Sequence, residues 1–246
     1  MRIKEKKEEI SYVDTQEFFR NRAKKYNDDS PYVTTMYQDK HPEIVNERNK
    51  LEVSKLLPLL KLDENSRILD VSCGIGRWAE AITKRIDRYC GVDFCEDFIE
   101  LAKKRNPASN KTFLVGRSAE ITRVLKESNI GKFNRALIVG ALMYLNDSDM
   151  ENCLVQVEES LEKNAVILIR EPVGLNARLT LKEEFSSDME TFYNAIYRTR
   201  EELKSAFADK LLAKGFKISQ EDFLFDAPNL NNRKETSQYY FILERK

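Results

Sequence analysis

Short aliphatic runs alternate with helical runs from residue 65 onward, and this alternation constrains the fold more than any other feature of the chain. Continuous apolar strands separated by helices are typical of a parallel sheet that helices cover on both faces. We therefore expect an α/β protein with a doubly wound sheet. The expected strands are residues 67–71, 89–94, 112–115, 136–140 and 165–170. The expected helices lie near residues 77–86, 96–105, 118–128 and 148–163, the last opened by a capping box of Ser148 and Glu151.

The two ends of the chain lack this alternation. Before it, we expect a frayed charged lead (1–13), a helix (14–27), an ordered loop (28–42) and a helix (43–60) that Pro58 kinks or shortens. After it, residues 171–198 contain no clear strand. Thr199 and Glu202 form a capping box for a helix to about residue 214, and residues 216–225 and 238–244 are strands that can pair as a hairpin. The predicted organisation is an N-terminal helical extension (1–64) and one domain (65–246) with an insertion at about 171–198.

The composition narrows the possible function classes. Forty-one basic residues balance 41 acidic residues among 246, which disfavours a general nucleic-acid-binding protein. The longest apolar runs, residues 136–143 and 165–169, are too short to cross a membrane. The opening MRIKEKKEEI lacks the apolar stretch of a secretory signal. We expect a cytoplasmic protein.

The cysteines and the single histidine do not predict a metal site. Cys73, Cys90, Cys95 and Cys153 form no CxxC pair, and His41 is the only histidine. A structural zinc site needs about four such ligands at clustered spacing. No metal is expected, and we interpret the cysteines as buried thiols in a reducing compartment.

A strand-to-helix turn within ILDVSCGIGRWAE, residues 68–80, carries two of the eight glycines. Gly74 and Gly76 permit a tight turn and close approach of a ligand to the backbone. The opening turn of the following helix offers free N–H groups. Asp93 lies 19 residues after Gly74 at the end of the next strand, where a carboxylate can accept two hydrogen bonds from a ribose. The combination predicts an adenosine-type ligand across the carboxyl edge of the sheet.

Asp70 separates two candidate ligands of this type. The segment from Gly74 to Ala79 also matches the GxGxxG/A fingerprint of NAD-binding folds. A carboxylate just before the turn would repel the pyrophosphate of NAD. S-adenosylmethionine (SAM) instead carries an ammonium group and a positive sulfur, which a carboxylate attracts. Asp70 therefore favours SAM.

The segments DVSCGIGRW, residues 70–78, and CGVDF, residues 90–94, resemble motif I and the second-strand acid of class I SAM-dependent methyltransferases. Within that class, LDxxCGIGRW is similar to a subgroup of small bacterial methyltransferases. The resemblance covers about residues 65–246. It implies a Rossmann-like, mostly parallel seven-stranded sheet of order 3-2-1-4-5-7-6 with an antiparallel last strand. In this chain we expect the N-terminal extension (1–64) to form a helical lid on that domain. It also implies SAM as cofactor and S-adenosylhomocysteine (SAH) as product. The family usually has glycine in place of Ser72, where a positive φ would cost serine about 1 kcal/mol.

The resemblance also assigns further cofactor residues. Ser118 and Ala119 lie where relatives contact adenine, with Phe94 packing on the ring. Gly140 lies where the backbone of relatives approaches the sulfonium. Tyr37 is part of a lid over SAM or, equally, of an N-terminal brace. The other predicted cofactor residues are Asp70, Ser72, Gly74, Gly76 and Asp93.

The methyl acceptor is expected among the segments outside the shared core, which look small for docking a folded macromolecule. Candidate bases are Glu171, Tyr144 and His41, although an amine or an anionic oxygen needs no base. Candidate acceptor ligands are Tyr197, Arg198 and Arg200, because a guanidinium can bind phosphate through two hydrogen bonds. Residues 140–143, GALM, lie where DNA-adenine methyltransferases usually have their catalytic motif. They lack the planar polar side chains that hold a flipped base.

The predicted reaction is methyl transfer to an O or N atom of a small polar metabolite, with no nucleic-acid or membrane partner. The resemblance to bacterial proteins implies a phosphorylated, phosphoramidate or sugar acceptor in natural-product or surface-polysaccharide (capsule) tailoring. Two alternatives stay open. One is an NAD(P)-dependent oxidoreductase, although the chain has no clear YxxxK motif. The other is a non-catalytic SAM-binding scaffold, since Ser72 departs from the family and a histidine common near Tyr144 is missing.

Overall fold

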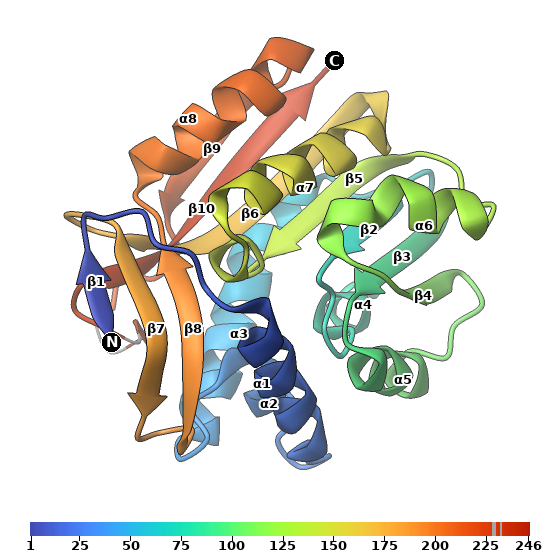
Figure 1. Cartoon of the computed structure of the whole chain (residues 1–246). Coiled ribbons are helices and arrows are strands. Elements are labelled where there is room, and N and C mark those ends of the chain that lie inside the picture. Colours follow the sequence, from blue (N-terminus) through green and yellow to red (C-terminus); the bar gives the residue numbers. More distant parts are fainter. Residues whose placement is uncertain (228–229, 232) are drawn as a thin grey trace.

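A computed structural model describes residues 1–227, 230–231 and 233–246. The alternating segments form one seven-stranded sheet of order β4-β3-β2-β5-β6-β10-β9 (Figure 1). Strands β4 to β6 are parallel to their neighbours, whereas β10 runs antiparallel to β6 and β9. The predicted order and the antiparallel last strand are thus confirmed. The strands are β4 (Lys111–Val115), β3 (Arg88–Asp93), β2 (Arg67–Val71), β5 (Phe133–Val139), β6 (Leu161–Gly174), β10 (Thr236–Arg245) and β9 (Lys217–Phe223).

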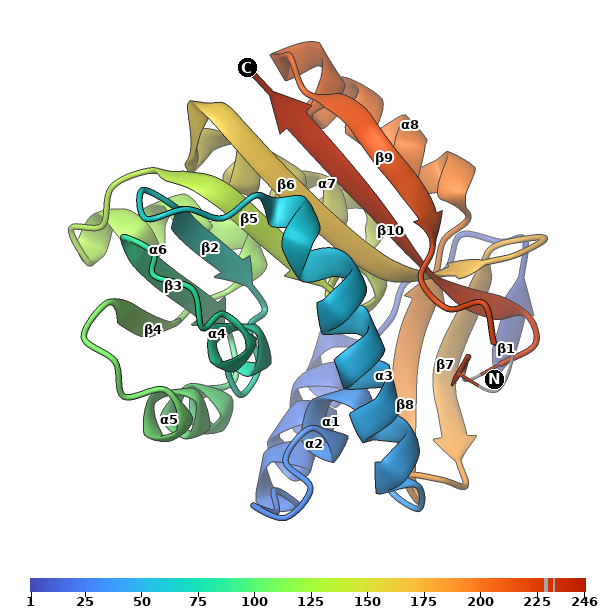
Figure 2. The ribbon, with the colours of Figure 1, turned by 180° about the vertical axis from the view of Figure 1, so that it is seen from behind.

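Helices cover both faces of this sheet, each over its own hydrophobic core (Figures 1 and 2). One face carries α6 (Ile121–Glu127), α7 (Asp147–Glu159) and α8 (Arg200–Lys210). The other carries α3 (Pro42–Leu56), α4 (Arg77–Ala81) and α5 (Glu96–Arg105). Strands buried on both faces explain the continuous apolar runs of the sequence. Short 3-10 helices span Leu57–Leu60, Ser118–Glu120, Leu142–Tyr144 and Leu212–Lys214.

A second, three-stranded sheet of order β1-β7-β8 corrects two expectations. The segment expected to lack strands contains the end of β6, then β7 (Leu179–Ser186) and β8 (Thr191–Tyr197). The lead expected to fray contains β1 (Arg2–Lys4), which pairs antiparallel with β7. The charged sequence RIK carries no strand pattern of its own. Its strand depends on backbone pairing with residues far along the chain, so the local sequence does not reveal it.

The N-terminal helices α1 (Tyr12–Lys24) and α2 (Val33–Met36) lie beside the small sheet and the carboxyl ends of the central strands (Figure 1). Phe18 packs with the small sheet in one hydrophobic cluster. Phe19 makes edge-to-face contacts with Phe94 and Tyr144, at centroid distances of 5.6 and 4.9 Å. The predicted helical lid is therefore built into the core, and α2 lies within the segment expected to be loop.

Several predicted element ends also need correction. Helix α4 ends at Ala81 instead of near residue 86. Helix α7 begins after Asn146, whose side chain bonds the backbone of Ile10 instead of capping the helix, so the Ser148 capping box is wrong. The capping box of Thr199 and Glu202 is confirmed. Among the described residues, no helix has both the length and the apolar character needed to cross a bilayer.

Candidate cofactor and acceptor site

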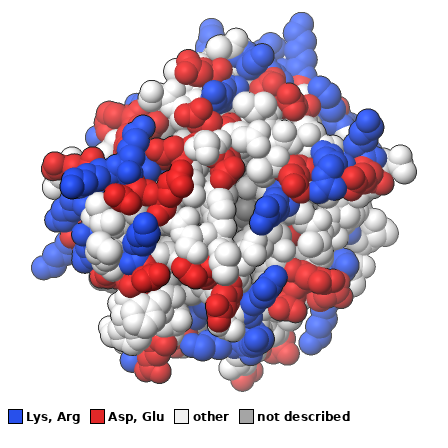
Figure 3. Space-filling model, in the orientation of Figure 1, with Lys and Arg blue, Asp and Glu red and all other residues white. Residues whose placement is uncertain are grey.

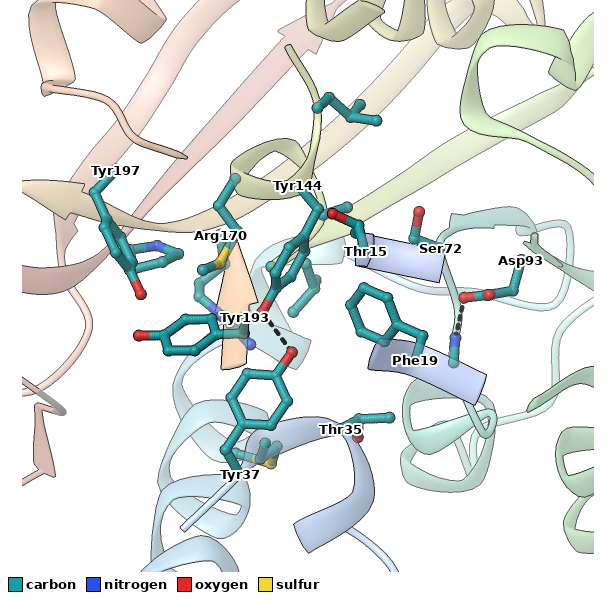
Figure 4. A pocket seen from close by; sticks show the side chains of 18 of the residues that line it. Thr15, Phe19, Thr35, Tyr37, Ser72, Asp93, Tyr144, Arg170, Tyr193 and Tyr197 are labelled. Atoms are coloured by element: carbon teal, nitrogen blue, oxygen red, sulfur yellow. Dashed lines mark hydrogen bonds between the residues drawn. The ribbon is translucent and has the colours of Figure 1, made fainter. Parts of the chain in front are cut away.

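A cavity of about 500 Å³ opens at the carboxyl ends of β2, β3, β5 and β6, and the N-terminal helices and the small sheet close it (Figure 4). This is the edge at which ligands bind in open α/β sheets. A single cavity thus joins the three parts of the fold. The predicted site residues that line it are Asp70, Ser72, Gly74, Asp93, Phe94, Ser118, Ala119, Gly140, Tyr37, Tyr144 and Tyr197.

The glycine turn adopts left-handed backbone at three positions. Ser72, Gly74 and Gly76 have φ values of +59°, +54° and +77°. A Cβ at Gly74 would also lie 3.0 Å from the Thr35 methyl carbon, so glycine at this position permits both the turn and the close approach of α2. Gly76 lies outside the cavity wall and lets α4 begin directly after the turn.

Asp93 connects the second strand to this turn. One carboxylate oxygen accepts the Gly74 N–H and the other accepts the Cys95 N–H, both at 2.9 Å. Burial raises the pKa of Asp93 to about 6, although these two hydrogen bonds act to lower it. The group is therefore mostly ionised at neutral pH, and each oxygen retains capacity to accept a further hydrogen bond.

Asp70 lies at the end of β2, on the floor of the cavity. It accepts a hydrogen bond from the Tyr89 hydroxyl. Burial raises its pKa to about 7, with a further contribution from Asp93 and an opposing one from Arg77. A cationic ligand group in the cavity would favour the ionised form of Asp70.

Tyr37 and Tyr144 form a hydroxyl-to-hydroxyl hydrogen bond across the middle of the site (Figure 4). In that view, Phe19, Ser72 and Asp93 lie on one side of the pair, and Tyr193 and Tyr197 lie on the other. Burial raises the pKa of both hydroxyls. Both are therefore neutral near pH 7 and suited to hydrogen bonding, not to proton abstraction.

Helix α3 contributes a buried charge network that ties the glycine turn to β6. Glu52 accepts hydrogen bonds from Arg77 at 2.9 Å and from Arg170 at 3.1 Å. Burial favours the neutral acid, yet the two arginines hold the pKa of Glu52 below its ordinary value. The carboxylate thus neutralises part of a strongly cationic wall.

Arg48 lies one helical turn before Glu52 and lines the cavity. The residue is buried, with only 5% of its surface exposed to solvent, and its Nε has no hydrogen-bond partner. Among the described residues, no hydrogen bond or ion pair reaches its guanidinium. Burial lowers its pKa to about 10, with Asp188 and Arg170 as the charged groups that act on it. A buried cation without a partner indicates a place for an anionic ligand group.

The comparisons with known proteins agree with this geometry. A family model described as "Methyltransferase domain" matches residues 68–164. The chain has the fold of the structure titled "DhpI-SAH complex structure", with a TM-score of 0.62, 14% identity and coverage of 95% of this chain and 96% of that one. It also has the fold of phosphoethanolamine N-methyltransferase 1 from Haemonchus contortus, solved with phosphoethanolamine and SAH. That TM-score is 0.65 at 16% identity, covering 96% of this chain and 50% of that one.

Residues 68–164 thus match a methyltransferase domain, and the chain as a whole has the fold of SAM-dependent methyltransferases.

A curated relative is similar to only a short part of this chain. The 23S rRNA (uracil(1939)-C(5))-methyltransferase RlmD of Aliivibrio fischeri is 32% identical over 68 residues, which is 26% of this chain and 16% of the relative. The chain thus spans about a sixth of that protein's length.

Two candidate functional residues of this chain are not evident from its sequence. Thr35 of α2 lies beside Gly74, and its buried Oγ1 has no hydrogen-bond partner. Arg48 sits in a charged helical segment that resembles any solvated helix. The spacing of Arg48 and Glu52 by four residues was the one available signal, because it places both on the same face of α3.

Glu171, a predicted base, does not line the cavity. Its carboxylate accepts the backbone N–H groups of Ala141, Leu142 and Met143 at 2.7, 2.9 and 3.1 Å. Burial raises its pKa. The geometry assigns Glu171 to holding the loop after β5, which does line the cavity.

Arg198, a predicted acceptor ligand, is buried away from the cavity. It bonds Asp147 at 2.7 Å and the carbonyl oxygens of Leu142 and Leu145 at 2.8 and 2.7 Å. Its donors therefore support the same loop as Glu171. The local sequence is the same whether an arginine points into the cavity or holds a neighbouring loop. The sequence alone therefore could not distinguish these two roles for Arg198.

Arg200 and His41 also lie outside the cavity wall. Arg200 begins α8 and stacks over the rings of Phe223 and Tyr239. His41 is exposed and faces Glu43 at 3.2 Å. The expected absence of a metal remains a prediction, although the described residues contain no cluster of metal-binding side chains.

Proposed function

We propose that this methyltransferase binds SAM along the carboxyl ends of β3, β2 and β5 and transfers its methyl group to a small polar acceptor beyond Tyr144. One observation carries the proposal. One cavity extends from Asp93, past the glycine turn, to the Tyr37–Tyr144 pair and the small sheet. Such a cavity supports a cofactor and an acceptor held in contact while water is excluded.

The adenosine half of SAM is proposed to lie at Asp93. The ionised carboxylate would accept the ribose hydroxyls, while it still holds the Gly74 and Cys95 N–H groups. Phe94 and Ser118 line the adjoining wall, where an adenine ring would be held. The edge contact of Phe19 with Phe94 would close this end.

The methionine half of SAM is proposed to lie against the glycine turn. Asp70 would attract its ammonium group and positive sulfur. The unpartnered guanidinium of Arg48 would hold its carboxylate, and the unpartnered Thr35 hydroxyl would bond the same end. Asp70 and Arg48 offer the two charges that the zwitterionic end of SAM requires, and Thr35 offers a hydroxyl, so the residues present fit the cofactor.

When bound, SAM supplies a methyl group on a positively charged sulfur. Gly140, with φ of +67°, would let backbone approach that centre closely. The neutral hydroxyls of Tyr37 and Tyr144 would orient the acceptor lone pair. Alignment and exclusion of water are the main requirements of such a displacement.

The size and charge of the site favour a small molecule as acceptor. The acceptor shares a cavity of about 500 Å³ with the cofactor. On the face that Figure 3 shows, acidic and basic side chains are interspersed, without the broad basic surface typical of nucleic-acid binding. A phosphorylated, phosphoramidate or sugar metabolite remains the proposed class, and phosphoethanolamine in a structural neighbour is an example of that size.

A reducing compartment such as the cytoplasm is proposed as the site of action. All four cysteines are buried free thiols. The NAD(P)-dependent alternative is disfavoured by the methyltransferase family match. The non-catalytic scaffold alternative differs from the proposal only in lacking methyl transfer. The activity test below therefore distinguishes the two.

The test is transfer of label from methyl-labelled SAM. Purified protein is incubated with labelled SAM and either a panel of small phosphates, carboxylates, amines and sugars, or total RNA. The proposal predicts labelled small product, and none with Asp93→Ala at the same SAM concentration. Label in RNA would contradict the small-molecule acceptor. SAM binding without any transfer, across a broad panel and cell extract, would favour the scaffold.

A further inference from the structure

Two arginines with unpartnered Nε atoms line the same cavity. They are Arg48 on α3 and Arg233 in the segment before β10. Arg48 is buried and Arg233 is half-buried, and a guanidinium that loses water without gaining an anion is costly, so each indicates a binding position for a negatively charged group. SAM carries a single anionic group, its carboxylate. One cofactor therefore cannot supply a partner to both arginines.

Arg48 lies on the helix that is bonded to the glycine turn, with Asp188 of the β7–β8 turn and Arg170 as the charged groups that act on it. Its neighbour Asn49 accepts a hydrogen bond from Arg77 at 2.9 Å, and Glu52 accepts another from the same residue. Arg77 follows directly after the glycine turn. Helix α3 thus holds Arg48 close to the place proposed for the methionine carboxylate.

Arg233 belongs to the opposite end, against the small sheet. Its guanidinium lies over the rings of Tyr193 and Tyr197, at 5.5 and 6.0 Å from their centroids. Among the described residues, its one hydrogen bond goes to the Tyr193 hydroxyl. Both tyrosines lie across the Tyr37–Tyr144 pair from Asp93 in Figure 4.

The carboxylates near Arg233 already have other partners. The charged groups that act on it are Arg2, Glu184 and Glu235. Glu184 pairs with the N-terminal ammonium group and with Arg2. Glu235 pairs with Arg2 and Lys4. The local cations therefore outnumber the carboxylates, and Arg233 forms no ion pair of its own within the described part of the chain.

We propose that Arg233 recognises an oxyanion, phosphate or carboxylate, on the methyl acceptor. The inference rests on the proposed function, since it takes the cofactor carboxylate to be held by Arg48. The planar guanidinium is stacked on Tyr193 and Tyr197, which orients its remaining donors for an oxyanion. The apolar side chains of Met143 and Met189 line the same cavity and would contact the body of the acceptor. Arg233 therefore replaces Arg198 and Arg200 as the proposed ligand of the acceptor.

The experiment uses calorimetry on the full chain and four variants. Arg233→Gln removes the charge, Arg233→Lys keeps the charge without the planar fork, and Arg48→Gln addresses the cofactor end. Arg200→Gln is the matched control, because Arg200 is also stacked on two aromatic rings but lies outside the cavity. Each protein is titrated with SAH. The SAH-loaded proteins are then titrated with phenyl phosphate, benzoate and the neutral analogue benzyl alcohol.

The proposal predicts that at least one anion binds SAH-loaded wild type tenfold or more tightly than benzyl alcohol. Arg233→Gln should remove this preference and leave SAH affinity unchanged within twofold. Arg233→Lys should retain part of the preference, and Arg200→Gln all of it. Comparison of phenyl phosphate with benzoate identifies the preferred oxyanion.

Three results would overturn the proposal. The anions could bind no better than the alcohol, Arg233→Gln could leave their affinity unchanged, or it could weaken SAH tenfold and so belong to the cofactor site. Absence of SAH binding by wild type would instead contradict the proposed function. The two failures are therefore distinguishable.

Discussion

At the scale of single residues, Ser72 is the main departure from the family's glycine turn, and its φ of +59° is the conformation that glycine tolerates best. Restoring glycine removes about 1 kcal/mol of strain but adds backbone entropy to the unfolded state. We expect Ser72→Gly to change unfolding free energy by less than about 1 kcal/mol and to preserve or improve SAH affinity. Denaturant unfolding and calorimetry measure both. A large loss of affinity in Ser72→Gly and in Ser72→Ala would instead make the hydroxyl a cofactor ligand.

Asp93 predicts a pH dependence of cofactor binding. Burial raises its pKa to about 6, and only the ionised form gives charge-assisted hydrogen bonds to a ribose. SAH affinity should therefore fall as the pH decreases through about 6. Asp93→Asn should bind more weakly at pH 8 and show a shallower decline. The decline that remains would belong to Asp70, whose pKa is raised to about 7. Identical pH profiles for the two proteins would argue against Asp93 as the ribose ligand.

At the scale of elements, α3 connects the glycine turn to β6 through Glu52. Glu52→Gln would leave Arg77 and Arg170 buried without their counter-charge. We expect a loss of about 3–5 kcal/mol in unfolding free energy, because breaking a buried pair leaves an uncompensated charge. The control Glu100→Gln, which breaks an exposed pair with Lys103, should cost no more than about 1 kcal/mol. Equal losses in urea unfolding would mean that the network adds nothing specific to α3.

Elements were predictable where the pattern is local. The central strands and their helices follow from hydrophobic periodicity, and the turn at Gly74 with Asp93 follows from backbone chemistry and spacing. Strand β1 was not predictable, because it exists through pairing with β7 far along the chain. The same limit applies to side chains. Thr35 and Arg48 become candidates only when tertiary packing leaves them buried without partners.

At the scale of the whole molecule, three parts meet at one cavity. The large sheet supplies the glycine turn and Asp93, helices α2 and α3 supply Thr35 and Arg48, and the small sheet supplies Tyr193 and Tyr197. The common sheet holds the adenosine half of the proposed cofactor position, α2 and α3 add ligands for its methionine half, and the small sheet shapes the proposed acceptor position. This division explains why the sequence indicated the cofactor more sharply than the acceptor.

Cofactor binding at Asp93 and Arg48 is tested by a calorimetric titration with SAH, 5′-methylthioadenosine and NADH. Wild type should bind SAH and not NADH. Asp93→Ala should weaken SAH and 5′-methylthioadenosine alike by about 1–3 kcal/mol, because both carry the ribose. Arg48→Gln should weaken SAH alone, because 5′-methylthioadenosine lacks the carboxylate. Preferential binding of NADH, or unchanged SAH affinity in both variants, would contradict SAM binding at this site.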